Sequence, residues 1–148
     1  MNYVDALQDT LKDGANNFWK SVKTMPADKF EWRPEPTTRT ARELAEEIVM
    51  TTGYVSKLVR AHKDPGMEDS TGDTIPKTIE VLEQEHRAKI DEFIAAVRDF
   101  PNEELKNTIE LPWGTWTFSQ VIAYPYWNLM YHWGQVNYIQ TLYGDKNM

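Results

Sequence analysis

Apolar residues recur every three or four positions along four segments of the chain, which is the spacing of one face of an α-helix. The first segment runs from about Tyr3 to Lys23, the second follows Thr40, the third ends before Pro101, and the last spans Phe118–Leu142. Helices of about twenty residues are about 30 Å long. The pattern therefore predicts an all-α fold, a four-helix bundle.

Local signals mark where two of these helices begin and where the chain is extended. Thr40 with Glu43, and Thr117 with Gln120, have the spacing of a capping box. Residues 107–116 carry strand-forming side chains interrupted by a Pro-Trp-Gly turn, which predicts an extended segment or a small hairpin before the last helix. The connections are longer than usual bundle turns, so they permit crossovers.

Length and charge exclude several classes of protein. A chain of 148 residues suits a single domain, residues 1–148. Its net charge of -7 without a basic run makes nucleic acid or an anionic membrane an improbable partner. There is no cysteine, which excludes disulfides and thiolate ligands. Without a signal-peptide pattern or a long apolar run, we expect a cytoplasmic protein.

The last helical segment carries polar side chains on its apolar face. His132 lies in the apolar stripe, Asn128 is one turn before it, and Gln135 is nearly one turn after it. Burying these groups costs stability unless they find partners, which could be protein groups, a metal ion or a substrate. Three aromatic residues of the same stretch are candidates to line a pocket: Trp127, Tyr131 and Trp133.

Two further residues are candidates from the other helices. Glu47 lies at the edge of the buried face of the second helix, where it is either a solvated charge or a ligand. His86 lies within the apolar stripe of the third helix. We favour a core histidine bonded to a neighbour over a ligand for His86, and keep it as a possible pocket residue.

Common catalytic motifs are absent from the chain. There is no HExxH spacing, no glycine-rich phosphate loop and no serine in a nucleophile elbow. The residues alone therefore predict a soluble helical bundle with a polar, aromatic interior site of unknown use.

Three short motifs resemble a known family. They are Trp32-Arg33-Pro34 before the Thr40-capped helix, Leu111-Pro112-Trp113-Gly114 before the last helix, and His132-Trp133-Gly134-Gln135. In this order, and over nearly the whole chain, they resemble DinB/YfiT-like proteins. These are damage-inducible four-helix bundles, distinct from the DNA polymerase of similar name.

The resemblance implies a bundle in up-down-down-up order, commonly dimeric, with a metal held by three histidines. One histidine comes from the second helix and two, four residues apart, from the last. In this chain those positions fall on Glu47, Asn128 and His132, so only one is histidine. Glu47 is a competent ligand, but the Asn128 carbonyl is a poor one for zinc or nickel. We therefore expect the site for a divalent metal (Zn, Ni or Mn) to be lost or weakened.

Two functions remain open at this point. Some members of the family resemble thiol-dependent transferases or metal-dependent hydrolases, and the retained His-x-Gly-Gln motif favours such an enzyme with a degenerate metal site. The missing histidines favour a non-catalytic homodimer that binds a small apolar or aromatic molecule. The substrate or ligand and any thiol cofactor are not readable from the residues.

Overall fold

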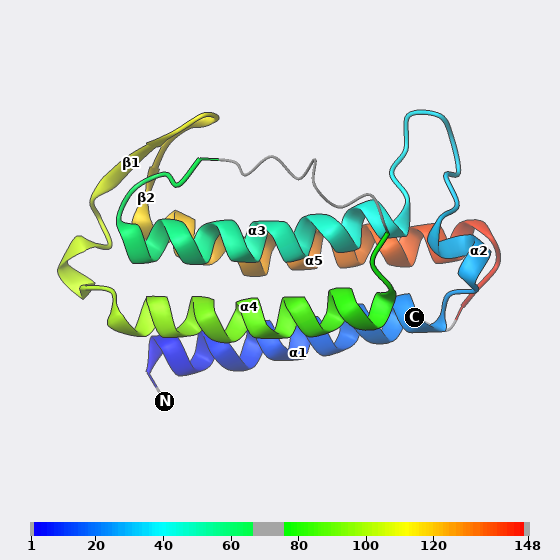
Figure 1. The fold of residues 1–148 in the computed structure, drawn as a ribbon, viewed down its shortest axis with the longest axis horizontal. Coiled ribbons are helices and arrows are strands. Elements are labelled where there is room, and N and C mark those ends of the chain that lie inside the picture. Colours follow the sequence, from blue (N-terminus) through cyan, green and yellow to red (C-terminus); the bar gives the residue numbers. More distant parts are fainter. Residues whose placement is uncertain (1, 67–75, 147–148) are drawn as a thin grey trace.

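Four long helices form the body of the protein in the computed structural model, which describes residues 2–66 and 76–146 (Figure 1). They are α1 (Tyr3–Thr24), α3 (Ala41–Ala61), α4 (Ile79–Asp99) and α5 (Phe118–Leu142). The short elements are α2 (Ala27–Phe30), a single 3-10 turn (Asn102–Glu104), β1 (Thr108–Leu111) and β2 (Gly114–Thr117). The predicted all-α bundle is confirmed. Among the described helices, none is long and apolar enough to cross a membrane.

The helices run in up-down-down-up order, as expected. Figure 1 shows α1 and α5 running in one direction and α3 and α4 in the other. Both α1 and α3 pack against α4 and α5. Since α3 and α5 are antiparallel neighbours, side chains at the middle of each helix meet at the middle of the bundle.

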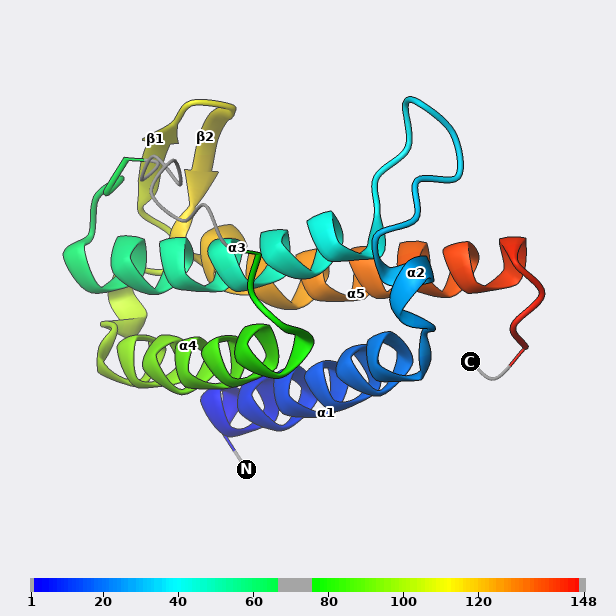
Figure 2. The same ribbon diagram turned by 45° about the vertical axis from the view of Figure 1, so that its right-hand side comes forward.

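The extended segment before the last helix is a hairpin. β1 pairs antiparallel with β2, with Thr108 opposite Thr117 and Leu111 opposite Gly114. Gly114 has a φ of 136°, a conformation that residues with a side chain rarely adopt. Figures 1 and 2 show this hairpin rising beyond α3 and α5 at one end, and the connection between α2 and α3 rising on the same side at the other end.

Both capping boxes form. The Thr40 hydroxyl accepts from the Glu43 backbone N–H (3.1 Å), and the Glu43 carboxylate accepts from the Thr40 N–H (2.8 Å). Thr117 and Gln120 make the same reciprocal pair. Each box satisfies two otherwise unpaired backbone donors. These local bonds fix the first residue of α3 and of α5.

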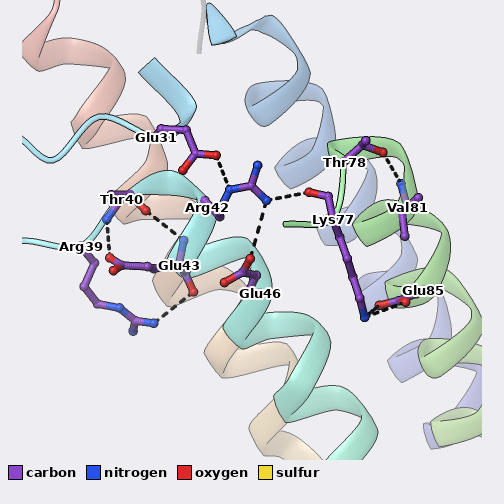
Figure 3. A network of polar contacts seen from close by, with 10 residues as sticks. All are labelled: Glu31, Arg39, Thr40, Arg42, Glu43, Glu46, Lys77, Thr78, Val81 and Glu85. Carbon is purple, nitrogen blue, oxygen red and sulfur yellow. Dashed lines mark hydrogen bonds and ion pairs between the residues drawn. The ribbon is translucent and has the colours of Figure 1, made fainter. Parts of the chain in front are cut away.

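The connection from residue 25 to residue 40 contains the short helix α2, although the prolines of this connection favour extended backbone. Lys29 lies over the Trp32 ring, 4.7 Å from its centroid, and Trp32 meets Tyr143 edge-on after the end of α5. Arg42, near the start of α3, bonds to Glu31 of the same part of the connection and to the Lys77 carbonyl just before α4 (Figure 3). Residues 29–32 are therefore held to both α3 and the residue after α5.

A chain of hydrogen bonds runs through the core around His86 and ends on a backbone carbonyl. The Trp19 indole N–H donates to His86 Nδ1 (3.0 Å), and His86 Nε2 lies 3.3 Å from the Thr52 hydroxyl. That hydroxyl donates to the Ile48 carbonyl (2.8 Å). Because Nδ1 accepts, the proton of the neutral ring is on Nε2. Burial, with smaller effects of Arg87 and Lys89, lowers the pKa of His86 to about 3.

We predict that His86 makes the fold acid-sensitive. The unfolded chain binds this proton near pH 6.5, but the folded chain does so only near pH 3, so stability is complete above pH 6.5 and falls below it. The slope is up to about 1.4 kcal/mol per pH unit. His86→Gln keeps a donor and an acceptor but does not titrate, so the stability difference between the two proteins should change across this range. Urea unfolding at several pH values measures it, and a pH-independent difference would contradict the prediction.

Candidate functional site

Glu47, Asn128 and His132 meet between α3 and α5. His132 Nε2 lies 2.8 Å from Glu47 Oε1, and Asn128 Nδ2 lies 3.4 Å from the same oxygen. Asn128 and His132 are one turn apart on the buried face of α5, and Glu47 faces them from α3. The structure thus brings together the three residues that the resemblance places at ligand positions.

Two more side chains complete the cluster. Arg39, which immediately precedes the Thr40 cap, pairs through Nη1 with Glu47 Oε2 and donates to the Glu43 carbonyl (3.1 Å). Gln135, three residues after His132, places Oε1 2.6 Å from His132 Nδ1. Both oxygens of the Glu47 carboxylate and both nitrogens of the His132 ring therefore have partners.

The protonation of His132 follows from these partners. Glu47 is an acceptor, so His132 Nε2 carries a proton. With the Gln135 oxygen facing Nδ1, that nitrogen is protonated as well. Turning the amide so that its NH2 faces Nδ1 gives the neutral ring instead, and the two orientations differ only in the assignment of O and N. Neither arrangement leaves a free lone pair on His132.

The Glu47 carboxylate is ionised and held in place. Burial opposes its ionisation, but hydrogen bonds from His132 and Arg39 outweigh burial and lower the pKa of Glu47 below its ordinary value. The side chain of His132 is 3% exposed and that of Glu47 is 25% exposed. The cluster is therefore reached from outside along Glu47 rather than along the histidine.

These residues do not fit the divalent metal that the family implies. The Arg39 cation already occupies one Glu47 oxygen, and its positive charge would oppose a metal ion nearby. Both nitrogens of His132 are already hydrogen-bonded, and Asn128 presents its Nδ2, a donor without a lone pair for a metal, toward Glu47. In the described part of the chain, no three His, Cys, Asp or Glu side chains converge on a metal position. We derive no chemical step through a metal.

Asn128 has one unsatisfied atom. Its side chain is buried, and Oδ1 accepts no hydrogen bond from the described residues. An unpaired buried acceptor costs about 1–3 kcal/mol, so it favours a water or ligand donor beside it. The neighbouring Tyr124 shares this environment: burial, and then the charge of Glu47, raise the pKa of its hydroxyl, while Asn128 acts in the opposite direction.

One groove opens at the Arg39 side of the cluster. It has a volume of about 510 Å³ and lies between the connection before α3 and the second half of α5. Arg39 and Gln135 form its polar wall, and Tyr131, Tyr138 and Leu142 belong to its apolar wall.

A second groove, which we call the aromatic groove, lies between the hairpin and the first half of α5. Its volume is about 500 Å³. Its lining consists of Trp113, Trp116, Gln120, Ala123, Tyr124 and Trp127. Successive ring contacts continue from Trp127 to Tyr131 and from Tyr131 to His132, so aromatic rings connect this groove to the polar cluster.

The candidate pocket residues divide between two sides of the bundle. Trp127 and Tyr131 are exposed and stack on each other, with centroids 5.4 Å apart. Trp133 instead faces α1 and donates its indole N–H to Ser21 Oγ (3.0 Å). His86 lies in the separate core network described above.

Four residues of the site area were not among the sequence candidates. Arg39 precedes a helix cap, where no pattern marks it as a partner for Glu47. Trp113, Trp116 and Tyr124 are visible only as aromatic residues near a turn and a helix start. The large number of aromatic residues in the sequence was a signal for a pocket, but the grouping of these three depends on how the hairpin folds onto α5.

The chain belongs to the DinB superfamily, whose family model matches residues 10–136. This match covers α3, the hairpin and the cluster of α5, and it confirms the resemblance of the three motifs. No curated protein matches the chain.

Two solved structures share the fold. A DinB-like protein of Bacillus subtilis, YjoA, aligns with a TM-score of 0.75 at 14% identity, over 97% of this chain and 95% of that one. A mutant of a mycothiol-dependent maleylpyruvate isomerase aligns with a TM-score of 0.65 at 11% identity, over 91% of this chain. This chain spans 61% of the isomerase's length.

We predict that Asn128→His creates a metal site. The new imidazole would lie one turn from His132 and opposite Glu47 Oε1, which gives two histidines and one carboxylate on a common point. Zinc or nickel affinity, measured by calorimetry on protein without a His tag, should rise about tenfold or more. The melting temperature should then rise with added metal.

Two controls accompany this substitution. Asn128→Ala removes the amide without adding a ligand and should gain no affinity. His132→Ala in the Asn128→His background should abolish the gain. If Asn128→His binds zinc no more tightly than the parent protein, the convergence of these three positions on one point is incorrect.

Proposed function

We propose that this protein is a metal-independent binding protein of the DinB superfamily. Its ligand is a small apolar or aromatic molecule held in the aromatic groove. The observation that carries this proposal is the grouping of Trp113, Trp116, Tyr124 and Trp127 around one open groove of about 500 Å³.

The groove has the size and composition of a small-molecule site. Such sites usually measure about 300–1,000 Å³ and are lined by aromatic and apolar side chains with few polar groups. Here Gln120 is the polar member of the lining, and the Trp127 side chain is 58% exposed. An apolar molecule stacked on these rings would remove their faces from water, which is favourable.

The polar cluster supports binding better than catalysis. A general base needs a free lone pair within reach of a substrate proton. Both nitrogens of His132 are engaged by Glu47 and Gln135, and the Glu47 carboxylate is paired with Arg39. The cluster thus stabilises the contact between α3 and α5.

A metal-assisted thiol transferase or hydrolase is the competing function. The convergence of Glu47, Asn128 and His132 favours it, and one structure of similar fold is a mycothiol-dependent isomerase. Stoichiometric zinc, nickel or manganese in tag-free protein would support this enzyme and overturn the metal-independent proposal.

We predict that Trp127→Ala weakens ligand binding. N-phenyl-1-naphthylamine, a neutral fluorescent aromatic probe, should bind the parent protein, and its affinity should fall roughly tenfold when this ring is lost. Because Trp127 is largely exposed, the variant should keep its melting temperature. Tyr3→Ala, which removes an exposed aromatic ring from α1, is the matched control.

A chelator separates the two functions in the same assay. Addition of EDTA should leave probe binding unchanged. Equal probe affinity for the parent and Trp127→Ala would remove the aromatic groove as the site.

We also propose that the protein is a homodimer through the second half of α5. Tyr131, Tyr138 and Leu142 are exposed on one face of this helix. Gly134 lies between them, and a Cβ there would meet nothing within 4 Å. A mid-helix glycine costs about 0.5–1 kcal/mol relative to alanine, and nothing in the described chain packs there to require it. Close approach of a second copy would explain both the glycine and the apolar face.

We predict that Tyr138→Glu yields a monomer. Tyr138 is 65% exposed, so the substitution should not unfold the chain, but it would bury a charge in the proposed interface. Light scattering at micromolar concentration should show a dimer for the parent and for Tyr3→Glu, and a monomer for Tyr138→Glu. A monomeric parent protein would contradict the proposal.

A further inference from the structure

The rings of the aromatic groove stand at steep angles to one another. Trp113 and Trp116 are inclined at 74°, with centroids 6.0 Å apart, and Trp116 and Tyr124 at 80°, with centroids 5.2 Å apart. Tyr124 and Trp127 are stacked at 24°. The planes of these rings therefore point in more than one direction, whereas rings stacked throughout would share a single direction.

Ring faces carry negative electrostatic potential. A cation near the face of an indole or phenol ring is attracted to it, and the attraction is strongest for indole. Three of the four rings in this groove are indoles. The described lining contains no lysine or arginine, and the cations Lys29 and Arg42 lie over rings outside the groove.

One acidic group also acts on a ring of the groove. Burial, and then the charge of the Glu47 carboxylate, raise the pKa of the hydroxyl of Tyr124, which lines the groove. The chain as a whole carries a net charge of -7, which raises the local concentration of cations.

We infer that the aromatic groove binds a small organic cation of the quaternary ammonium class. This rests on the proposed function, because it assigns a charge to the ligand of the same groove. The methyl groups of a trimethylammonium head contact the indole faces, and its delocalised charge keeps the cost of leaving water low. A primary ammonium group is more strongly hydrated and lacks this apolar shell, so it binds less well.

Choline and 3,3-dimethylbutan-1-ol test the charge directly. The two molecules have nearly the same shape, but the second replaces the ammonium nitrogen with carbon and is neutral. Calorimetry on the full chain should show choline binding at least about threefold more tightly than the alcohol. Quenching of tryptophan fluorescence should report the same order.

Trp116→Leu separates cation recognition from apolar contact. Leucine retains an apolar wall but removes the ring face, so choline affinity should fall by a larger factor than affinity for the alcohol. Trp32→Leu, which changes a tryptophan at the other end of the bundle, should alter neither affinity. The melting temperature of each variant shows whether the hairpin is intact.

The outcomes distinguish the inference from the proposed function. If the alcohol binds as tightly as choline, the inference that the ligand is a cation is wrong, and the proposal of an apolar ligand stands. If N-phenyl-1-naphthylamine binds but neither choline nor the alcohol does, the groove takes larger neutral rings, and the inference of a cationic ligand is again wrong. If none of the three binds, both the inference and the proposed function fail.

Discussion

The contact between Glu47 and His132 joins α3 to α5 at the centre of the polar cluster. A carboxylate that is three-quarters removed from water needs partners, and here it has a histidine, an amide and a guanidinium. These partners come from α5 and from the connection before α3. One ionised group therefore links two helices and the loop before α3.

This arrangement explains how the bundle keeps a polar interior although two of the three histidines that the resemblance implies are absent. A metal ion would supply positive charge at the centre of such a site. In this protein Arg39 supplies positive charge from the side, and the capping box at Thr40 positions its backbone. The consequence is a cluster in which both nitrogens of His132 are hydrogen-bonded, so that His132 has no free nitrogen for chemistry.

The exposed aromatic and apolar side chains lie instead on the outer side of α5. Its first half forms the aromatic groove with the hairpin, and its second half presents Tyr131, Tyr138 and Leu142. Ligand binding and self-association can therefore use separate parts of one helix. Both uses depend on aromatic rings that are at least partly exposed, whereas the buried core has its own aromatic residues, among them Phe18, Trp19 and Phe93.

The sequence by itself determined the four helices, the caps of α3 and α5, the extended turn and the inward direction of Asn128 and His132. These features follow from helical periodicity and from bonds between residues three apart, which are local. Only the tertiary structure decided that Arg39 meets Glu47 and that Trp127 faces outward while Trp133 faces α1. The reason is that α5 carries aromatic side chains on its outer as well as its inner side, so periodicity could not tell which rings face outward, and the contacts of Glu47 join residues up to 85 positions apart.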